Sequence, residues 1–541
     1  MRSHWLRLQA WHLVALALAG LLAVNRPTQP LLGTLGLLAY PMAATWIAAA
    51  WARRNRNGPR VALLATLAAA GACGLAGALR HLLTPHLIVG PFPPDMSWMV
   101  LTSLAVAAAI LSTVTALVAG STQAPSWCRH AIAPLLTALL LGLLAMSAWR
   151  LASLESSTPS LLLGDLVRLE TSTLEREEAS SLLAPLLAIL GEERQARQLH
   201  AERWPRLPTS PPAWTPPPTV EPWREAAADI AAQHRIVLIM ESHHVSEHRE
   251  LVRRLLPTFA EHGFHYFAAE TFQAPHDELA TPGGSSLGMG FYGQDPRFGE
   301  LVRDALSLDF TLISYDYGAS APEDREQQQA EKLAAVLAED PDARLLVHVG
   351  YFHLLKHPTF DGERWMASRL WELTGIEPYT LWQLSSEPTA GQGPTDHERL
   401  TSVVGTRDEP VVLRPMPKHA ISSFRDLFEA DTEIVDALVL HPPLKETRLG
   451  RPTWLPASGR HRLAGTVRGG KRPLLVLARS VSGTPGVVPL DQVVLRFGDE
   501  FELWVSDERA TVELHDQVGK VGPQAEWSVG GGPVELLVEG R

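Results

Sequence analysis

The stretch Arg235-Ile-Val-Leu-Ile-Met-Glu-Ser-His-His244 decides the fold that the sequence predicts. Residues 236–240 form a short, continuous apolar run, as expected of a strand that is buried on both faces of a parallel sheet. The run ends at Glu241, and a polar segment that contains His244 follows directly. Polar residues often end strands, so this strand end becomes informative only together with the ends of the strands that follow it.

Strand and helix patterns alternate downstream of this run. The next helix is expected at about 246–261, with Leu251, Leu255 and Phe259 on one face. Repeated strand–helix units of this length predict an α/β domain with a mostly parallel sheet covered on both faces. The further elements are a strand at 266–269, a helix at 295–308, a strand at 311–315, a helix at 323–338 and a strand at 344–349.

Side chains suited to acid–base or metal chemistry stand at the carboxyl end of each of these strands. Ligand sites in open α/β sheets form outside the carboxyl ends of the strands, so we expect these side chains to line one functional cleft. They are Glu241 and His244 after the first strand, Glu270 after the second, Asp316 after the third, and His348 and His353, on either side of Gly350, around the end of the fourth.

Residues 240–249 hold more side chains suited to catalysis or metal binding than the other segments that we considered. His244, Glu247 and His248 match the inverted zinc-peptidase pattern H-x-x-E-H, in which two histidines one helical turn apart bind zinc. That geometry requires a helix, whereas here the motif follows a strand directly. The alternative interpretation is a solvated, polar start of a helix.

Two other patterns have structural as well as functional interpretations. Residues 284–288 match the G-x-S-x-G nucleophile elbow, but a loop rather than a strand precedes them, so we interpret them as a flexible loop. Arg325 opens the helix before the fourth strand. It is either a surface residue or a group that binds a substrate carboxylate or stabilises an oxyanion.

The order of these motifs resembles a known superfamily. Glu241-Ser-His-His244, Phe267-Ala-Ala-Glu270, Arg325 and Leu346-Val-His-Val-Gly-Tyr-Phe-His353 follow one another as in the erythromycin esterases, the ChaN haem-binding lipoproteins, and the TraB and Tiki metalloproteases. The resemblance covers about residues 236–383, and Met240 stands where the family usually has glycine. It implies that Glu-x-x-His, a second Glu, an Arg and a late His converge on one site.

This resemblance leaves several functions open, because the superfamily does not share one activity. The main hypothesis is a hydrolase of ester, lactone or peptide bonds, acting on a small molecule or a peptide. Its base would be His244, with Glu241 and Glu270 as partners and Arg325 and His353 binding substrate or stabilising charge. It would work either without a cofactor or with zinc or manganese, held by ligands drawn from Glu241, His244, Glu270, His348 and His353.

Two non-catalytic hypotheses remain beside the hydrolase. The first is a haem- or metal-binding module, in which Tyr292, Tyr315 or Tyr351 could ligate haem iron. The second is a ligand sensor with a degenerate enzyme domain.

The first 150 residues predict a membrane anchor. Apolar stretches at about 5–24, 31–51, 61–83, 98–120 and 130–151 each approach the length that crosses a bilayer. Arginines near residues 2–7, 53–60 and 129 place the N-terminus in the cytoplasm. The sequence therefore predicts a multi-pass protein of the inner membrane with about five helices, the lipid bilayer as partner, and a periplasmic soluble part. A cleaved signal peptide in the first stretch is the alternative.

Charge, glycine-rich turns and proline-rich segments divide the chain into its predicted parts. Ten arginines and one acid give residues 1–150 a charge of about +9, so the total of −11 leaves about −20 for the rest, which argues against nucleic acid as a partner. Short apolar runs with glycine-rich turns after about residue 460 predict a small β-sandwich or barrel. The predicted parts are 1–152 (membrane helices), 153–222 (amphipathic helix and proline-rich linker), 223–457 (α/β domain) and 458–541 (β domain).

Overall fold

The structure is a computed structural model that describes residues within 154–541. The described residues are 158–171, 176–203, 218–281, 284–317, 324–359, 362–387, 394–416, 421, 434–483 and 486–538.

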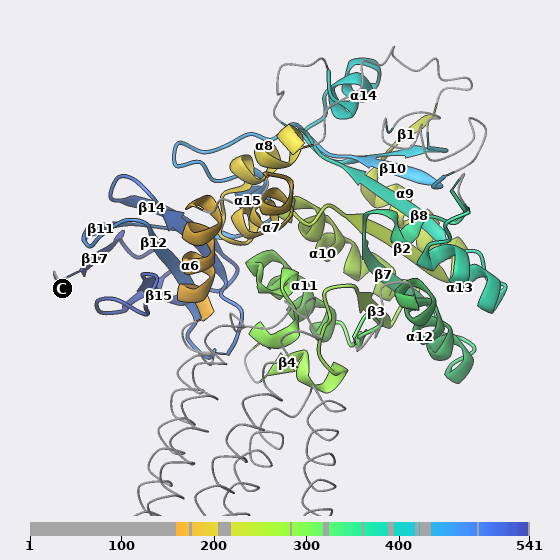
Figure 1. Cartoon of the computed structure of the whole chain (residues 1–541), viewed down its shortest axis with the longest axis horizontal. Helices are drawn as coiled ribbons and strands as arrows, with labels where there is room; N and C mark the ends of the chain where they lie inside the picture. Colours follow the sequence, from red (N-terminus) through yellow and green to blue (C-terminus); the bar gives the residue numbers. More distant parts are fainter. Residues whose placement is uncertain are drawn as a thin grey trace, which may run out of the picture. The chain divides into compact units, whose positions relative to one another are not determined.

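A mixed sheet of eight strands organises the α/β part (Figure 1). Its order is β1-β9-β10-β8-β2-β7-β3-β6, and the strands from β10 to β6 are parallel to one another. At the other edge β9 pairs antiparallel with both β10 and β1. The strands are β1 (Thr219–Pro222), β2 (Ile236–Glu241), β3 (Tyr266–Ala269), β6 (Thr311–Ile313), β7 (Leu345–Gly350), β8 (Tyr379–Leu384), β9 (Val411–Arg414) and β10 (Ala437–Leu440).

Helices cover both faces of this sheet and give it two cores. Val237 and Ile239 of β2 pack in one core with α9, α10 and α11, whereas Ile236 and Leu238 pack in the other with α12 and α13. Because successive strand residues point to opposite faces, a strand between two cores must be apolar throughout. The helices are α9 (Trp223–Gln233), α10 (Ser246–Glu261), α11 (Pro296–Ser307), α12 (Arg325–Glu339), α13 (Met366–Thr374), α14 (Asp396–Val404) and α15 (Trp454–Ala457).

The C-terminal strands form a sandwich of two small sheets. One sheet has the order β14-β11-β17 and the other β13-β12-β15-β16. Leu463 and Leu503 of the first sheet share a core with Val476 and Val512 of the second. The strands are β11 (His461–Gly469), β12 (Leu474–Ser480), β13 (Asp491–Leu495), β14 (Glu500–Val505), β15 (Arg509–His515), β16 (Ala525–Ser528) and β17 (Val534–Val538).

Helices α6 (Thr158–Thr171), α7 (Arg176–Ile189) and α8 (Glu193–Arg203) belong to the segment that the sequence assigned to a helix and linker. Leu166 and Leu186 pack against Leu475 and Leu477 of β12, so α6 and α7 cover the outer face of the sandwich (Figure 1). The next helix, α8, reaches the α/β part. Of the predicted proline-rich linker, residues 204–217 lie outside the described residues.

Buried ion pairs join the sandwich to the α/β part. Arg460, directly before β11, pairs with Glu250 of α10 and with Glu300 of α11, and all three side chains are almost fully buried. Arg297 of α11 and Arg451 both pair with Asp491 of β13. The Arg460 pairs hold the sandwich against α10, the helix that follows β2 and the polar segment after it, and against α11.

The structure does not support the predicted membrane anchor. Among the described residues no helix is both long and apolar enough to cross a membrane. The helix α10, for example, has 16 residues and contains five arginine and glutamate side chains within Glu247–Arg254, whereas a crossing takes about 20 apolar residues. The five predicted membrane helices at 5–151 lie outside the described residues. We therefore correct the sequence-based prediction: the multi-pass fold, its orientation and the inner-membrane or periplasmic localisation find no support and are not proposed.

Replacing Arg460 with methionine should destabilise the protein by about 3 kcal/mol, because Glu250 and Glu300 would lose a buried cationic partner. Urea unfolding followed by circular dichroism measures this change. Arg462→Met is the matched control, since the Arg462 side chain is 54% exposed and lies 3.3 Å from Glu502. The control should change stability by less than about 0.5 kcal/mol. Equal losses in both variants would contradict the role given to Arg460.

Candidate functional site

Polar side chains gather at the carboxyl edge of the parallel strands. Glu241 ends β2, Glu270 follows β3, Asp316 follows β6, Gly350 ends β7 and Glu387 follows β8. Because these strands are parallel neighbours, their carboxyl ends meet at one edge of the sheet. The side chains there form three adjoining networks, centred on Glu241, on Glu270 and on Glu387.

In the first network, Glu241 is held by Arg249 and in turn holds His243. The Arg249 guanidinium is fully buried and donates from Nε to Glu241 Oε2 at 2.9 Å. His243 Nδ1 lies 2.7 Å from Glu241 Oε1. Burial alone raises the pKa of the Glu241 carboxyl, but Arg249, His348 and His243 outweigh it and hold that pKa far below its usual range. An ionised carboxylate only accepts hydrogen bonds, so His243 Nδ1 carries the proton.

The His243 ring is held in a tight slot. It stacks on Tyr292, with ring centroids 3.9 Å apart, and meets the edge of the Tyr351 ring at 5.2 Å. A Cβ on Gly350 would lie only 2.6 Å from His243 Nε2 and 2.6 Å from Glu270 Oε2, so both groups border the same glycine. The His243 side chain is 13% exposed, and within the described residues its Nε2 makes no hydrogen bond.

Tyr351 adopts a backbone conformation that its residue type disfavours. Its φ is +36°, in a region that non-glycine residues rarely occupy. Strained residues of this kind cluster at functional sites, where the surrounding contacts hold them in place. Here the strained turn carries the Tyr351 ring between His243 and His244.

The second network ties Glu270 to Arg325. Arg325 donates one hydrogen bond to Glu270 Oε1 at 2.7 Å and two to the Asp316 carboxylate at 2.8 Å each. The Gly350 backbone N–H donates to Glu270 Oε2 at 2.6 Å. Burial alone raises the pKa of Glu270, but His353, His243 and Arg325 lower it well below its usual value. Arg325 is the most accessible member, with a side chain that is 33% exposed.

His353 completes this network as a buried cation. Its Nδ1 lies 2.7 Å from Glu326 Oε1 and its Nε2 lies 3.4 Å from Glu270 Oε1. Burial alone lowers the pKa of His353, but the two carboxylates outweigh it and raise that pKa to about 10. His353 is therefore an imidazolium at neutral pH, suited to fixing charge rather than to accepting a proton.

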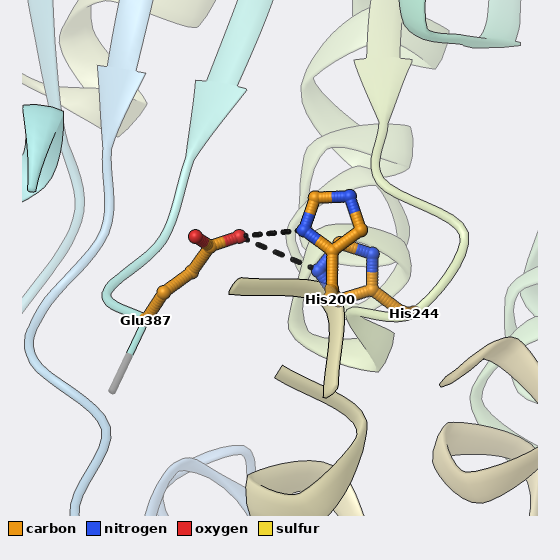
Figure 2. Close-up of side chains that lie close together, drawn as sticks. All are labelled: His200, His244 and Glu387. Carbon is orange, nitrogen blue, oxygen red and sulfur yellow. Dashed lines mark hydrogen bonds and ion pairs between the residues drawn. The ribbon is translucent and has the colours of Figure 1, made fainter. Parts of the chain in front are cut away.

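The third network joins His244 to two residues from other parts of the chain. His200 Nδ1 of α8 lies 3.0 Å from Glu387 Oε1, and His244 Nε2 lies 3.6 Å from the same oxygen. Figure 2 shows the two imidazole rings overlapping, with the carboxylate close to both. The rings are stacked with centroids 3.8 Å apart, and His244 Nδ1 lies 3.3 Å from the Tyr351 hydroxyl. Burial, with the charge of His200, lowers the pKa of His244 to about 3, so its ring is neutral.

His348 lies beneath these networks in the core. Its side chain is almost fully buried and packs near the rings of Phe267 and Phe298. Its Nε2 lies 3.6 Å from Glu241 Oε2, and within the described part of the chain it has no hydrogen-bond partner. Burial lowers the pKa of His348 to about 4, although Glu241 acts in the opposite direction.

The predicted site residues thus lie at one edge of the sheet but in separate groups. Glu270, Arg325 and His353 contact one another as a set, whereas Glu241 contacts His243 and His348. His244, the predicted base, contacts neither glutamate by any hydrogen bond or ion pair that involves the described residues. It belongs instead with His200 and Glu387.

The residues missed by sequence reasoning are His243, His200 and Glu387. His243 is adjacent to His244, and spacing alone does not tell which ring meets Glu241. Glu387 carries a usable signal, because it follows the strand β8 just as the predicted residues follow theirs. His200 has no such signal in the sequence, because nothing in the helical segment 193–203 indicates that this helix lies beside the sheet.

The motif H-x-x-E-H does not form a two-histidine metal site. The Ser242 backbone N–H donates to His248 Nδ1 at 2.9 Å, so the proton of that ring is on Nε2, which donates to Ser385 Oγ at 3.1 Å. Both nitrogens of His248 are therefore occupied. In the G-x-S-x-G segment, Gly284–Ser285 forms a short strand, and Ser286 caps the 3-10 helix Leu287–Met289 by accepting from the Gly288 backbone N–H. The interpretation of this segment as a flexible loop is therefore wrong, and Ser286 Oγ acts as a helix cap.

The candidate haem ligands have other contacts. Tyr315 is fully buried and donates from its hydroxyl to the His348 carbonyl oxygen at 3.3 Å. Tyr292 and Tyr351 pack against His243. No tyrosine among the described residues is singled out as a haem ligand.

Comparisons with protein-family models, curated proteins and solved structures gave no significant match to this chain.

The charge on His353 predicts a pH-dependent contribution to stability. The groups around it are Glu270, Glu326 and Arg325, with the Trp365 ring at its edge. Because the folded pKa of about 10 exceeds the unfolded value of 6.5, the contribution is complete below pH 6.5 and is lost as the pH rises through 10.

His353→Gln should therefore lower the free energy of unfolding by on the order of 3–5 kcal/mol at pH 6 and by much less at pH 10. Urea unfolding of both proteins at pH 6, 8 and 10 tests this. His265→Gln, on a side chain that is 47% exposed, is the control and should show little change. A loss that does not depend on pH would mean that His353 is neutral.

Gly350→Ala should disturb the contact between the first two networks. The added methyl group would overlap Glu270 Oε2 and the His243 ring. Neither has much room to shift, because Arg325 holds Glu270 and Tyr292 packs on His243. We expect a loss of about 1–3 kcal/mol in thermal or urea unfolding. Gly519→Ala, where nothing lies within 4 Å of the new Cβ, is the matched control. Equal stability of the two variants would contradict the tight packing at Gly350.

Proposed function

We propose that the protein is a hydrolase of ester, lactone or peptide bonds, with His243 as the general base that activates water. The observation that carries the proposal is the 2.7 Å contact between His243 Nδ1 and Glu241 Oε1. A carboxylate that accepts from one ring nitrogen fixes the tautomer and leaves the other nitrogen as the acceptor of a proton. Arg249 orients the carboxylate itself through two hydrogen bonds, of 2.9 and 3.3 Å.

Accessibility favours His243 over its neighbour His244 for this role. The side chain of His243 is 13% exposed, whereas that of His244 is 1% exposed. A general base must reach a water molecule and the substrate, and a fully buried ring does not. The proposal therefore moves the base from His244, where the sequence suggested it, to His243.

Arg325 is the proposed group that stabilises negative charge on the substrate. Its position is fixed by Asp316 and Glu270, and a third of its side chain remains exposed. Fixed cationic donors of this kind stabilise the oxyanion that develops in acyl transfer. Glu270 acts as a positioning residue, because it accepts a hydrogen bond from Arg325 beside the Gly350 turn that His243 also borders. The His353 imidazolium acts through Glu270, whose ionised carboxylate it stabilises at 3.4 Å.

The order of the motifs along the chain supports the same reaction class. Glu241, His244, Glu270, Arg325 and His353 occupy the positions that resemble those of the erythromycin esterase and Tiki superfamily, whose members include hydrolases. The resemblance matches His244 rather than His243 to the histidine of the first motif, so it supports the reaction class and not the choice of base. We propose a distant relationship to that superfamily. Met240, in place of the usual glycine, is compatible with this fold because it lies fully buried inside β2 and is followed by Glu241 in the same strand.

His243→Gln should lower kcat/KM by about 10²–10⁴-fold for any substrate that the wild-type protein hydrolyses, because the general base is lost. The assay uses the full chain with a p-nitrophenyl ester, an aliphatic lactone and a fluorogenic peptide. His265→Gln is the matched control and should keep wild-type rates. Circular dichroism establishes that both variants are folded.

Two outcomes would contradict this proposal. One is a folded His243→Gln variant that hydrolyses at the wild-type rate. The other is the absence of turnover by the wild-type protein in all three substrate classes.

A further inference from the structure

Three side chains from distant parts of the chain converge beside the proposed catalytic dyad. His200 lies on α8, His244 lies in the segment after β2, and Glu387 lies in the segment after β8. One ligand atom of each falls within 4.8 Å of the other two (Figure 2). Two of the three residues, His200 and Glu387, lie outside the stretch that resembles the esterase superfamily.

The distances between these atoms suit a shared metal ion. His200 Nδ1 and His244 Nε2 lie 3.0 and 3.6 Å from Glu387 Oε1. Ligands at about 2.0–2.2 Å from one ion are themselves roughly 3.0–3.5 Å apart at octahedral or tetrahedral angles. The observed spacing therefore needs only small side-chain movements to place an ion among the three atoms.

A second observation concerns the nitrogen that faces the carboxylate. His244 is 1% exposed, and its Nε2 has no hydrogen-bond partner in the described structure. Leaving such an atom unsatisfied costs about 1–3 kcal/mol. An ion pair between His200 and Glu387 alone would not remove this cost, whereas an ion bound to Nε2 would.

The surroundings of His244 prepare that nitrogen for coordination. Its other nitrogen, Nδ1, lies 3.3 Å from the Tyr351 hydroxyl. Metal-binding histidines generally donate their second N–H to a neighbouring acceptor, which leaves the first nitrogen with a free lone pair. The nearest turn of α8 adds little repulsion, because the Arg197 guanidinium is paired with both Glu193 and Glu247.

We propose that His200, His244 and Glu387 form a binding site for one divalent transition-metal ion. Two imidazoles and one carboxylate favour ions such as Zn²⁺, Co²⁺ or Mn²⁺ over Mg²⁺ and Ca²⁺, which prefer all-oxygen ligands. The bound ion ties α8 to the carboxyl edge of the sheet. The site is separate from the His243–Glu241 dyad and does not depend on the proposed hydrolase activity.

Metal binding is measured directly on the full chain. After dialysis against EDTA, Zn²⁺, Co²⁺ and Mn²⁺ are each added, and bound metal is measured by elemental analysis and calorimetry. We expect about one ion per chain with at least one of these metals, visible absorption bands from bound Co²⁺, and a higher melting temperature in the loaded protein.

The variants His200→Ala and Glu387→Gln should each weaken binding by at least about 10-fold. His265→Ala is the matched histidine control, and it should bind like the wild-type protein. His243→Gln should also retain the ion, which separates this proposal from the hydrolase. Circular dichroism shows whether each variant is folded, and Glu387→Gln changes only one polar atom.

Three results would overturn the proposal. The first is a wild-type protein that retains none of the three metals. The second is equal binding of the ion by folded His200→Ala and Glu387→Gln. The third is a loss of binding in His265→Ala as large as in those two variants.

Discussion

The buried Arg249 guanidinium is the group on which the arrangement of the site depends. It bonds to Glu241 at the end of β2, to Asp295 at the start of α11 and, at 2.9 Å, to the His243 carbonyl oxygen. A buried cation of this kind is stable only when carboxylates and backbone oxygens surround it. The contacts fix the chain as it turns from β2 into α10. Consecutive residues of that turn then point in different directions, His243 toward Glu241 and His244 toward Glu387.

The three networks meet at the turn that follows β7. The Gly350 N–H bonds to Glu270, and the absence of a side chain lets His243 approach. Tyr351 then lies between the two histidines, with its ring edge at His243 and its hydroxyl near His244. The proposed base, the Arg325 network and the proposed metal site are consequently neighbours, and one strained residue borders two of them.

Local sequence patterns predicted much of the α/β part, because its strands must be apolar on both faces. The strands expected at 236–240, 266–269 and 344–349 coincide with β2, β3 and β7, and the helix expected at 246–261 coincides with α10. Parallel pairing then brings Glu241, Glu270 and Arg325 to one edge, as the sequence suggested. The N-terminal prediction uses the length of the apolar stretches and the placement of arginines between them, and the described helices give it no support.

The composition of each network could not be predicted in the same way. Which partner a buried side chain finds depends on tertiary packing, and spacing along the chain does not encode it. His200 comes to the site because α6 and α7 pack on β12 and place α8 beside the sheet. The choice between His243 and His244 depends on the direction of a single turn, which Arg249 fixes through contacts with Glu241 and Asp295.

The position of the proton on the His243 ring tests the central claim most directly. Long-range ¹H–¹⁵N correlation spectra of the imidazole side chains distinguish the two tautomers, and the His243→Gln spectrum assigns the signal. The structure predicts that the neutral ring carries its proton on Nδ1, donated to Glu241, with Nε2 unprotonated. A neutral ring with its proton on Nε2 would contradict both the contact with Glu241 and the role of His243 as a base.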